Sequence, residues 1–312
     1  MADFDPKSLD QLGDWRRSHL CGELRGADAG KPVLLAGWVH SVRDHGGLLF
    51  VDLRDKTGFT QVVFSPQGAP KAFERAGALR SEWVIAVKGA CKHRGPDLVN
   101  PKIPTGEIEV AVDELKILNK ATPPPFPIED QVDTTEEVRL KHRVQDLRRP
   151  VMQKRLLLRH KVSLAVRNYM DRNGFVEVET PMLLKSTPEG ARDFLVPSRL
   201  YPGKFYALPQ SPQILKQLLM VAGTNKYFQL ARCFRDEDLR ADRQYEFTQI
   251  DFEMSFVGEE DIFSLMEGMI GDIFMASEDA GFKWPMPKAP FLRMTHAEAL
   301  ARYGTDKPDI RF

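Results

Sequence analysis

A proline-rich stretch near the middle of the chain, PPPFP at residues 123–127, limits most strongly what this sequence can fold into. Proline lacks a backbone N–H and fixes φ, so this stretch excludes both a helix interior and a central strand. Such a segment forms a stiff, extended connector. Because 312 residues also exceed one average domain, we predict a first domain at 1–118, a linker at 119–137 and a second domain at 138–312.

The residues before the connector alternate between apolar and polar side chains from Val33 to Leu118, a pattern typical of half-buried strands. Glycine-rich connections, DHGG and DKTG, separate short segments of this kind. The segment APKAFERAGALR instead has helical spacing, with Phe73, Ala76 and Leu79 on one side. Four or five short strands with a helix between the third and the fourth predict an OB-like β-barrel.

The residues after the connector mix helical and strand patterns, which makes the whole chain α+β. Helices are predicted at 135–147, from Pro150 to the residue before Gly174, at 213–223 and at 259–281, and a strand is predicted from Phe175 until Pro181 ends it. Pro150 and Gly174 mark the ends of the longest helix, while Ser211 and Pro212 are predicted to be the N-cap and first-turn residues of the third. The apolar stripe of the longest helix is predicted to comprise Leu157, Val162, Leu164, Ala165 and Val166.

Between two strand-like stretches lies a long charged segment, FRDEDLRADRQYEFTQIDFEMSF at 234–256, although a hairpin turn needs only a few residues. Strand side chains alternate, so one face of this hairpin is apolar and the other carries Arg235, Glu237 and Phe247 near the turn. We predict that the polar face is an open floor, where the arginine binds a phosphate or carboxylate and the ring stacks on a purine. The simpler interpretation is a solvated hairpin with cross-strand ion pairs.

Charge and cysteine content exclude several classes of protein. Lys plus Arg and Asp plus Glu both number 44, so affinity for a polyanion has to come from local patches. The three cysteines, Cys21, Cys91 and Cys233, are widely separated, which argues against a disulfide framework and a zinc site and predicts buried thiols in a reducing compartment. No apolar run reaches the roughly 18–20 residues of a membrane span, and the N-terminus is acidic. We therefore predict a cytoplasmic protein.

Three segments carry a resemblance to a known family. FRDEDLRADRQYEFTQID resembles the second signature motif of class II aminoacyl-tRNA synthetases in its aspartyl form, GFVEVETPML resembles the first motif, and QSPQILKQ resembles the aspartate-recognition segment. The likeness extends over nearly the whole chain, which is similar to bacterial-type aspartyl-tRNA synthetases. It implies an OB-fold barrel followed by an antiparallel sheet flanked by helices. The last strands of that sheet cannot be found in the sequence, so an N-terminal fragment is expected.

The resemblance also implies an activity and the residues that perform it: ATP-dependent attachment of L-aspartate to tRNA(Asp) through an aspartyl-adenylate. Arg235 is implied to be catalytic, because it bridges the substrate carboxylate and the α-phosphate. The other implied ATP-binding residues are Asp236, Glu237, Gln244 and Phe247. The implied aspartate-binding residues, besides Arg235, are Glu189, Ser211, Gln213 and Lys216. Mg²⁺ is implied as a companion of ATP, with ligands expected outside this chain, and no metal ligand can be identified within it.

The barrel is implied to bind the tRNA anticodon through Arg43, His45, Phe50 and Gln61. An aromatic ring stacks on an unpaired base and polar groups meet its edges. In this family a histidine at the position of His45 accompanies relaxed recognition, so tRNA(Asn) is a further expected partner. Pro181 and the helix before it are implied to form a homodimer interface.

Two alternatives to the ligase stay open at this point. In the first, the chain is a truncated, catalytically inactive tRNA-binding protein in which only the barrel functions. In the second, it adenylates or amidates an amino acid without tRNA, although retention of Arg43, Phe50 and Gln61 counts against that interpretation.

Overall fold

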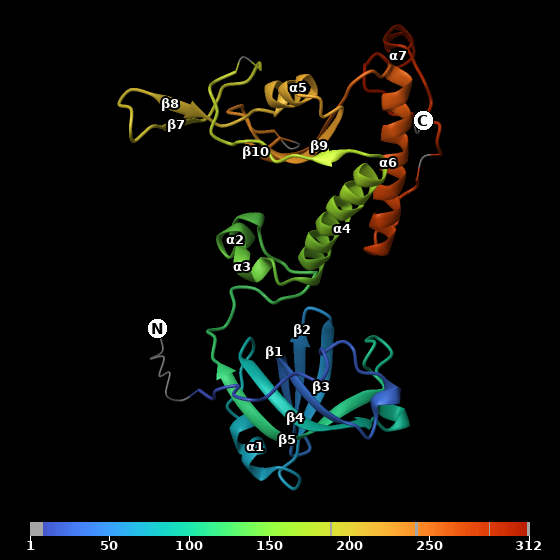
Figure 1. Cartoon of the computed structure of the whole chain (residues 1–312). Coiled ribbons are helices and arrows are strands. Elements are labelled where there is room, and N and C mark those ends of the chain that lie inside the picture. The colour runs from blue at the N-terminus through green and yellow to red at the C-terminus, as the bar shows by residue number, and fades with distance from the viewer. Residues whose placement is uncertain (1–8, 188, 241–242, 287, 311–312) are drawn as a thin grey trace. The chain divides into compact units, whose positions relative to one another are not determined.

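The computed structural model describes residues 9–187, 189–240, 243–286 and 288–310. The chain divides into two compact units, Met1–Gln153 and Lys154–Phe312. All barrel strands belong to the first unit and the remaining sheets to the second (Figure 1). Residues 1–8, with which the predicted first domain begins, lie outside the described residues.

The first unit is built around a closed barrel. Its elements are η2 (Gly26–Asp28), β1 (Pro32–His45), β2 (Leu48–Asp55), β3 (Gly58–Phe64), α1 (Pro70–Ala76), β4 (Val84–His93), η3 (Pro96–Leu98) and β5 (Ile108–Asn119). The strands follow the order β1-β2-β3-β5-β4, in which β3 and β5 pair in parallel and the other neighbours are antiparallel. Helix α1 comes between β3 and β4, so the OB-like arrangement predicted from the sequence is confirmed.

Alternate side chains of every strand fill the barrel interior. Fully buried residues include Leu35, Val51, Val62, Val87 and Val110, one from each strand. Burial of one such side chain contributes about 1.5–3 kcal/mol to folding. The intervening side chains point away from this core, which leaves one face of β2 and β3 available for other contacts.

Two local features shape β1. Its register against β2 shifts between Val39 and Ser41, so His40 occupies a β-bulge. The strand then ends in a two-residue turn in which Gly46 and Gly47 have φ values of 61° and 77°. Both values lie in the left-handed region that glycine adopts without a steric penalty, as a tight hairpin turn requires.

Beyond the proline-rich connector, the helix predicted at 135–147 is wrong as a single element. The structure has α2 (Glu136–Lys141) and α3 (Arg143–Asp146), separated at His142, whose φ and ψ are −110° and 45°. Within α3, Asp146 is fully buried and accepts a hydrogen bond of 2.8 Å from Arg149, a contact that fixes this second short helix separately from α2. The next helix, α4 (Pro150–Arg172), begins and ends as predicted.

The second unit contains a three-stranded sheet in the order β10-β9-β6. Its elements are β6 (Val176–Glu177), β7 (Leu195–Pro197), β8 (Phe205–Ala207), α5 (Gln213–Val221), β9 (Lys226–Phe234), β10 (Glu246–Met254), α6 (Glu259–Asp279) and α7 (His296–Tyr303). β9 and β10 are antiparallel, whereas β6 pairs with β9 in parallel. The strand predicted from Phe175 to Pro181 is therefore wrong in length, since only two of its residues pair with β9.

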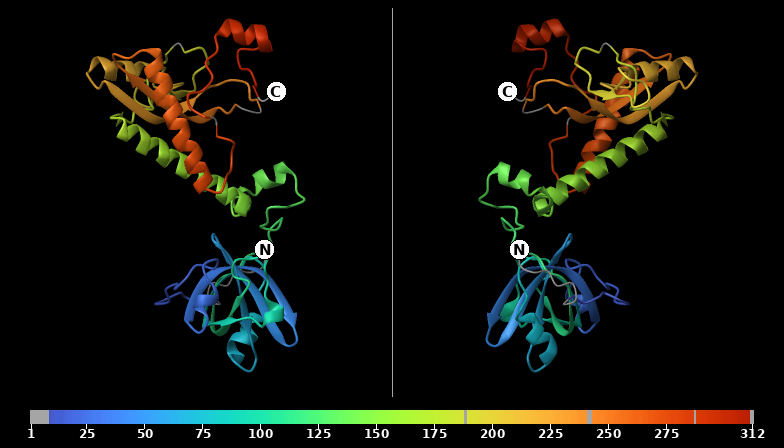
Figure 2. Two further views of the ribbon diagram at one scale, coloured as in Figure 1. Left: turned by 90° about the vertical axis from the view of Figure 1, so that its right-hand side faces the viewer. Right: turned by 90° about the vertical axis from the view of Figure 1, so that its left-hand side faces the viewer.

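Helices cover both faces of this sheet. The apolar face packs on α4 and α6, which lie against the sheet in both views of Figure 2, through a core that includes Val166, Phe228 and Leu265. Only Val166 of the predicted α4 stripe is fully buried, while Leu157 and Leu164 are 46% and 43% exposed. Helix α5 contacts β9 and β10. No helix among the described residues is long and apolar enough to span a membrane.

The polar face of the β9–β10 hairpin is not the open floor that was predicted. Gln229, Ala231, Cys233 and Asp251 lie on this face and are all buried. Alternation alone identified the face correctly, but it could not show that α5, which comes earlier in the chain, closes its inner half. Only the end near the hairpin turn stays accessible.

Candidate functional site

Arg235 and Phe247 lie at the accessible end of the hairpin. Phe247 on β10 is opposite Cys233 on β9, and the Arg235 backbone N–H donates to the carbonyl of Tyr245 at 2.8 Å. The Arg235 guanidinium carbon is 5.0 Å from the centre of the Phe247 ring, an attractive cation–π arrangement. The prediction that both side chains share one face is therefore confirmed.

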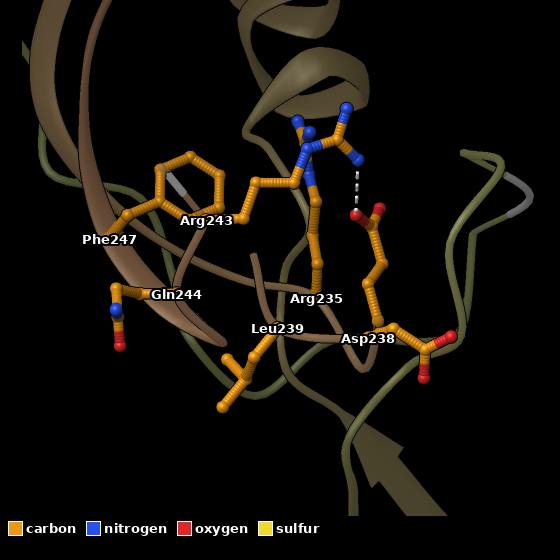
Figure 3. Close-up of a pocket in the computed structure, with 7 residues that line it drawn as sticks. Arg235, Asp238, Leu239, Arg243, Gln244 and Phe247 are labelled. Atoms are coloured by element: carbon orange, nitrogen blue, oxygen red, sulfur yellow. Dashed lines mark hydrogen bonds and ion pairs between the residues drawn. The ribbon is translucent and has the colours of Figure 1, made fainter. Parts of the chain in front are cut away.

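These two residues line a pocket of about 340 Å³. Figure 3 shows the Arg235 and Arg243 side chains extending to the same side, whereas Gln244 points away from them. Arg243 forms an ion pair of 3.1 Å with Glu237. In the described part of the chain Arg235 has no such carboxylate partner, so its charge is available to an anion. The pocket is lined by Arg235, Glu237, Asp238, Leu239, Arg243, Gln244 and Phe247.

Four of the five expected ATP-binding residues therefore line this pocket: Arg235, Glu237, Gln244 and Phe247. The fifth, Asp236, does not line it. Asp236 pairs through its backbone with Arg192, whose carbonyl accepts from the Asp236 N–H at 3.0 Å. Asp238, Leu239 and Arg243 also line the pocket, although the sequence did not assign them to ATP binding. Their position on the same charged segment was the available signal.

A second cluster centres on Lys216 of α5. Lys216 is only 8% exposed, and its Nζ lies 2.9 Å from Asp251 Oδ1 and 3.3 Å from Glu253 Oε2. The second oxygen of Asp251, Oδ2, is buried without a hydrogen-bond partner. One positive charge faces two carboxylates, so the cluster has a local excess of negative charge and an unsatisfied acceptor, features suited to a ligand that carries an ammonium group.

Glu189 lies beside the start of α5. Ser211 Oγ donates to Glu189 Oε2 at 2.6 Å, and Thr187 Oγ1 donates to Glu189 Oε1 at 3.2 Å. Helix α5 begins at Gln213, as predicted, but its N-cap is Pro212 and not the predicted Ser211. Ser211 Oγ also accepts from the Gln213 N–H at 3.3 Å, which ties Glu189, Ser211 and Gln213 into one local group.

Cys233 connects the pocket with the Lys216 cluster. Burial raises the pKa of its thiol to about 11, while the charge of Arg235 opposes this rise and those of Asp251 and Glu189 add to it. The buried Cys233 Sγ lies 3.8 Å from Gln249 Oε1, and Gln249 Nε2 donates to Asp251 Oδ1 at 3.1 Å. The two clusters therefore form a continuous charged region on the polar face of the hairpin.

The thiols provide a direct test of this environment. At pH 8 a thiol with a pKa of about 11 is ionised to about one part in a thousand, compared with about a quarter for an ordinary thiol. All three cysteines are free and buried. We expect the native protein to react with a disulfide reagent at least about a hundredfold more slowly than the urea-unfolded chain. A thiol that reacts rapidly in the native chain contradicts the buried position of Cys233.

Polar residues also gather on the barrel. Arg43 Nη2 donates to both carboxylate oxygens of Asp52 at 3.0 Å and approaches Gln61 Oε1 at 3.4 Å. Phe50 is opposite Arg43 in the β1–β2 pairing and is half-buried, so both lie on one surface. We call Arg43, Phe50, Asp52 and Gln61 the Arg43 surface. His45 is exposed at the β1–β2 turn, at the end of the strand that carries Arg43.

Two further residues belong beside the Arg43 surface. Glu109 on β5 accepts from Gln61 Nε2 at 3.1 Å. Burial lowers the pKa of the Arg94 guanidinium, while the negative charges of Glu109 and Asp52 oppose this effect. The Nη2 atom of Arg94 is buried without a hydrogen-bond partner. Sequence reasoning did not identify either residue, because their proximity depends on the parallel pairing of β3 with β5.

The described residues do not form a magnesium site. Mg²⁺ prefers several oxygen ligands in near-octahedral geometry. Within the described ranges no group of three or more His, Cys, Asp or Glu side chains could hold a metal ion. Glu237 and Asp251 are instead paired with Arg243 and Lys216.

The first unit is an OB-type barrel with a polar surface, a fold suited to binding nucleic acid. The second contains a sheet beside which an arginine stacks on a phenylalanine, an arrangement suited to binding a nucleotide. Residues 33–118 match the family of OB-fold nucleic acid binding domains that includes anticodon-binding domains. Residues 135–312 match the class II tRNA synthetases (D, K and N). The chain belongs to this class II synthetase family, as the motifs indicated.

Individual relatives agree with this assignment. The aspartate--tRNA(Asp/Asn) ligase of Caldanaerobacter subterraneus subsp. tengcongensis is 59% identical over 303 residues, which are 97% of this chain and 50% of the relative. The enzyme of the same name from Persephonella marina is 58% identical over 305 residues, with the same shares covered. The chain spans about half the length of the curated relatives it matches.

Solved structures show the same fold. Asparaginyl-tRNA synthetase from Pyrococcus horikoshii, complexed with asparaginyl-adenylate, matches with a TM-score of 0.78 at 25% identity over 92% of this chain and 66% of that chain. A putative aspartyl-tRNA synthetase from Leishmania major Friedlin matches with a TM-score of 0.76 at 20% identity, covering 87% and 55%. The second likeness supports the fold alone.

Proposed function

We propose that this chain carries the anticodon-binding and amino-acid-activating residues of an ATP-dependent ligase that attaches L-aspartate to tRNA(Asp). The observation that carries the proposal is the Arg235 guanidinium, which stacks on Phe247 and lacks a carboxylate partner among the described residues. A buried lysine with two acidic partners lies on the same face of the hairpin. The 59% identity to an aspartate--tRNA(Asp/Asn) ligase supports the same assignment.

In the activating step, an aspartate α-carboxylate oxygen attacks the α-phosphorus of ATP, the new P–O bond forms, and pyrophosphate leaves. The two reactants are anions that repel each other, so charge neutralisation and positioning lower the barrier most effectively. Arg235 supplies a fixed positive charge for the carboxylate and the α-phosphate. Phe247 presents its other surface to adenine, while Glu237 holds Arg243 beside the phosphates. Magnesium bound with ATP would further neutralise the phosphates.

The Lys216 cluster fits the rest of the aspartate molecule. Lys216 Nζ neutralises the side-chain carboxylate, and Asp251 Oδ2, buried without a partner, accepts a hydrogen bond from the substrate ammonium. Glu189 approaches the ammonium from the Ser211 side, and Gln213 lies next to Ser211 at the start of α5. Asparagine lacks the second carboxylate and cannot form this additional ion pair with Lys216, so aspartate is the preferred substrate.

The Arg43 surface is the proposed anticodon site. Phe50 stacks on an unpaired base, while Arg43, Gln61 and His45 meet base edges or phosphates. Relatives named for both tRNA(Asp) and tRNA(Asn), together with His45 at the exposed β1–β2 turn, support charging of both tRNAs. The proposed domains are 1–118 and 138–312 with the linker between them, and the proposed location is the cytoplasm.

We also propose a homodimer. In the described sheet β6 is an edge strand, and Val176 on it is 54% exposed. Leu157 and Leu164 on α4 and Leu183 after Pro181 are also exposed, so an apolar surface surrounds this edge. Edges of this kind invite pairing with a second chain. Sedimentation equilibrium that finds only monomers at micromolar concentration contradicts this proposal.

Pyrophosphate exchange tests the proposed activity. Exchange is expected with aspartate and not with asparagine or lysine, and aspartate is expected to be transferred to transcripts of both tRNA(Asp) and tRNA(Asn). Tight tRNA binding without any exchange supports the catalytically inactive alternative. Exchange that depends on asparagine or lysine contradicts the substrate assignment.

Phe50→Ala separates the two functions. The substitution is expected to weaken tRNA(Asp) binding by about ten- to a hundredfold, because loss of one base–aromatic stack costs about 1–3 kcal/mol. ATP binding should not change. Filter binding of tRNA and titration with a fluorescent ATP analogue measure the two effects. Phe59→Ala is a suitable aromatic control, since Phe59 on β3 stacks on His40, and a similar loss of tRNA affinity in both variants contradicts the role of Phe50.

A further inference from the structure

A buried group of charged residues lies between the barrel and the segment that leads into α4. Arg54 Nη2 on β2 donates to both oxygens of Glu82 at 2.8 and 3.0 Å. Arg148 Nη2 lies 2.5 Å from Glu82 Oε2, and the Arg148 guanidinium lies over Trp38 at 4.5 Å. We call Arg54, Glu82 and Arg148 the Glu82 cluster. All its members belong to the first compact unit.

Glu82 occupies this place at a conformational cost. Its φ is 67°, in the left-handed region that non-glycine residues rarely adopt, and its side chain is 5% exposed. The Glu82 N–H donates to the Val39 carbonyl at 2.7 Å, which holds the strained backbone beside the β-bulge of β1. Backbone strain of this kind, about 1–3 kcal/mol, persists only where surrounding contacts enforce it. The contacts to Arg54 and Arg148 are the ones available here.

The Glu82 cluster is continuous with the Arg43 surface. Phe50, Asp52 and Arg54 alternate along β2, so their side chains leave the strand on the same face. Ser41 Oγ donates to Asp52 Oδ2 at 2.7 Å, and the next residue back, His40, places Nδ1 at 2.9 Å from Arg54 Nη1. The bulge at His40 thus sits between the two groups.

The cluster also reaches the start of α4. Arg149, next to Arg148, is buried and donates to the carbonyls of Glu129 and Asp130 at 2.8 and 2.7 Å. Asp130 Oδ1 in turn accepts from the Val151 N–H in the first turn of α4 at 2.7 Å. Hydrogen bonds and ion pairs therefore run from the Arg43 surface to the residues that begin this helix.

We propose that Glu82 is a positioning residue that couples RNA binding at the Arg43 surface to docking of residues 146–151 onto the barrel. The inference rests on the proposed function, because it takes an anticodon stem–loop as the ligand of that surface. The docked segment is the two-state element. When it is released, Arg148 leaves Glu82, and the Arg54–Glu82 pair beside the bulge loses its second arginine.

Thermodynamic linkage gives this coupling a measurable form. If RNA binds the docked form more tightly, it has to stabilise docking, and docking has to strengthen RNA binding by the same factor. Coupling between sites typically changes affinity by about 5- to 150-fold. In the proposed coupling, Arg148 pairs with Glu82 and does not contact the RNA. Its removal is therefore expected to weaken binding without changing the number of phosphates that the protein neutralises.

Arg148→Gln tests the proposal in the 312-residue chain. The variant keeps the buried Arg54–Glu82 pair, which protects the barrel fold. In the wild type, a saturating anticodon stem–loop of tRNA(Asp) is expected to slow hydrogen exchange of amides in 146–151 by at least about fivefold. In the variant this protection is abolished, and stem–loop affinity falls by the same factor. Arg139→Gln, which removes a positive charge from α2 and lies outside both the Glu82 cluster and residues 146–151, should leave both quantities unchanged.

The salt dependence of binding distinguishes coupling from direct recognition of RNA by Arg148. If the Arg148 side chain neutralises a phosphate, its removal makes the slope of log affinity against log salt shallower by about 0.9, whereas coupling leaves the slope unchanged. A shallower slope therefore overturns the proposal, as does protection of 146–151 that persists in Arg148→Gln. Glu82→Gln is expected to abolish the same protection while β1–β5 amides stay protected. If the stem–loop protects no barrel amide in the wild type, the proposed function itself fails.

Discussion

Arg235→Ala is expected to weaken ATP binding by about ten- to a hundredfold. The guanidinium stacks on Phe247 and has no carboxylate partner in the described part of the chain, so it is free to donate charge-assisted hydrogen bonds to phosphate. Such bonds contribute about 1.5–3 kcal/mol each, and 1.4 kcal/mol corresponds to tenfold in affinity. Titration with a fluorescent ATP analogue measures the effect, and aspartate-dependent pyrophosphate exchange should be abolished.

Arg232→Ala is the matched control for this experiment. Arg232 lies on β9, three residues before Arg235, but is half-exposed and pairs with Glu246 at 2.9 Å. It does not line the Arg235 pocket. The control is expected to change ATP affinity by less than about twofold, because exposed ion pairs contribute little. Equal losses in the two variants show that net charge, and not the position of Arg235, determines ATP binding.

Local patterns predicted much of the fold because they depend on neighbours in the sequence. Alternation placed Phe50 outside and Val51 inside the barrel, and it assigned Arg235 and Phe247 to one face of the hairpin. Proline and glycine signals placed both ends of α4. Each of these features follows from backbone geometry within a few residues, so an isolated sequence contains the information.

Contacts between distant segments could not be predicted in the same way. The hairpin pattern marks Gln229 and Asp251 as polar, but only α5 packing on β10 buries them. The expected helix at 135–147 is interrupted at His142, and Asp146 in its second part is buried against Arg149, a tertiary contact that the local pattern does not show. The length of β6 also depends on a distant segment, because a strand ends where its partner strand stops pairing with it. Here β9 pairs only with Val176 and Glu177.

The residues of the candidate site likewise differ in whether the local sequence or a distant contact determines their position. Arg235, Glu237, Gln244 and Phe247 belong to one charged segment, and its length alone indicated a site. By contrast, the partners of Lys216 are 35 and 37 residues further along the chain, on β10. A lysine on an amphipathic helix is ordinarily exposed, so its burial between two carboxylates is a property of the tertiary structure.

Lys216→Met is expected to destabilise the second unit by about 3–5 kcal/mol, the usual cost of leaving one member of a buried ion pair without its partner. The Lys216 side chain is 11% exposed and that of Asp251 2%, so water cannot replace the ammonium group beside Asp251. Methionine keeps a similar length, which limits the loss of packing. Hydrogen exchange of β9 and β10 amides under native conditions reports this local stability, while exchange in β1–β5 serves as an internal reference.

A second substitution separates charge from packing. In Lys216→Met/Asp251→Asn the buried carboxylate is gone, so stability should recover by at least about 1–2 kcal/mol relative to Lys216→Met alone. Glu253→Gln is the matched control, because its side chain is 30% exposed and lies farther from Lys216, at 3.3 Å; it should cost less than about 1 kcal/mol. If the double variant is as unstable as the sum of the two single variants, Lys216 acts through packing, and the proposed charge complementarity with aspartate loses its basis.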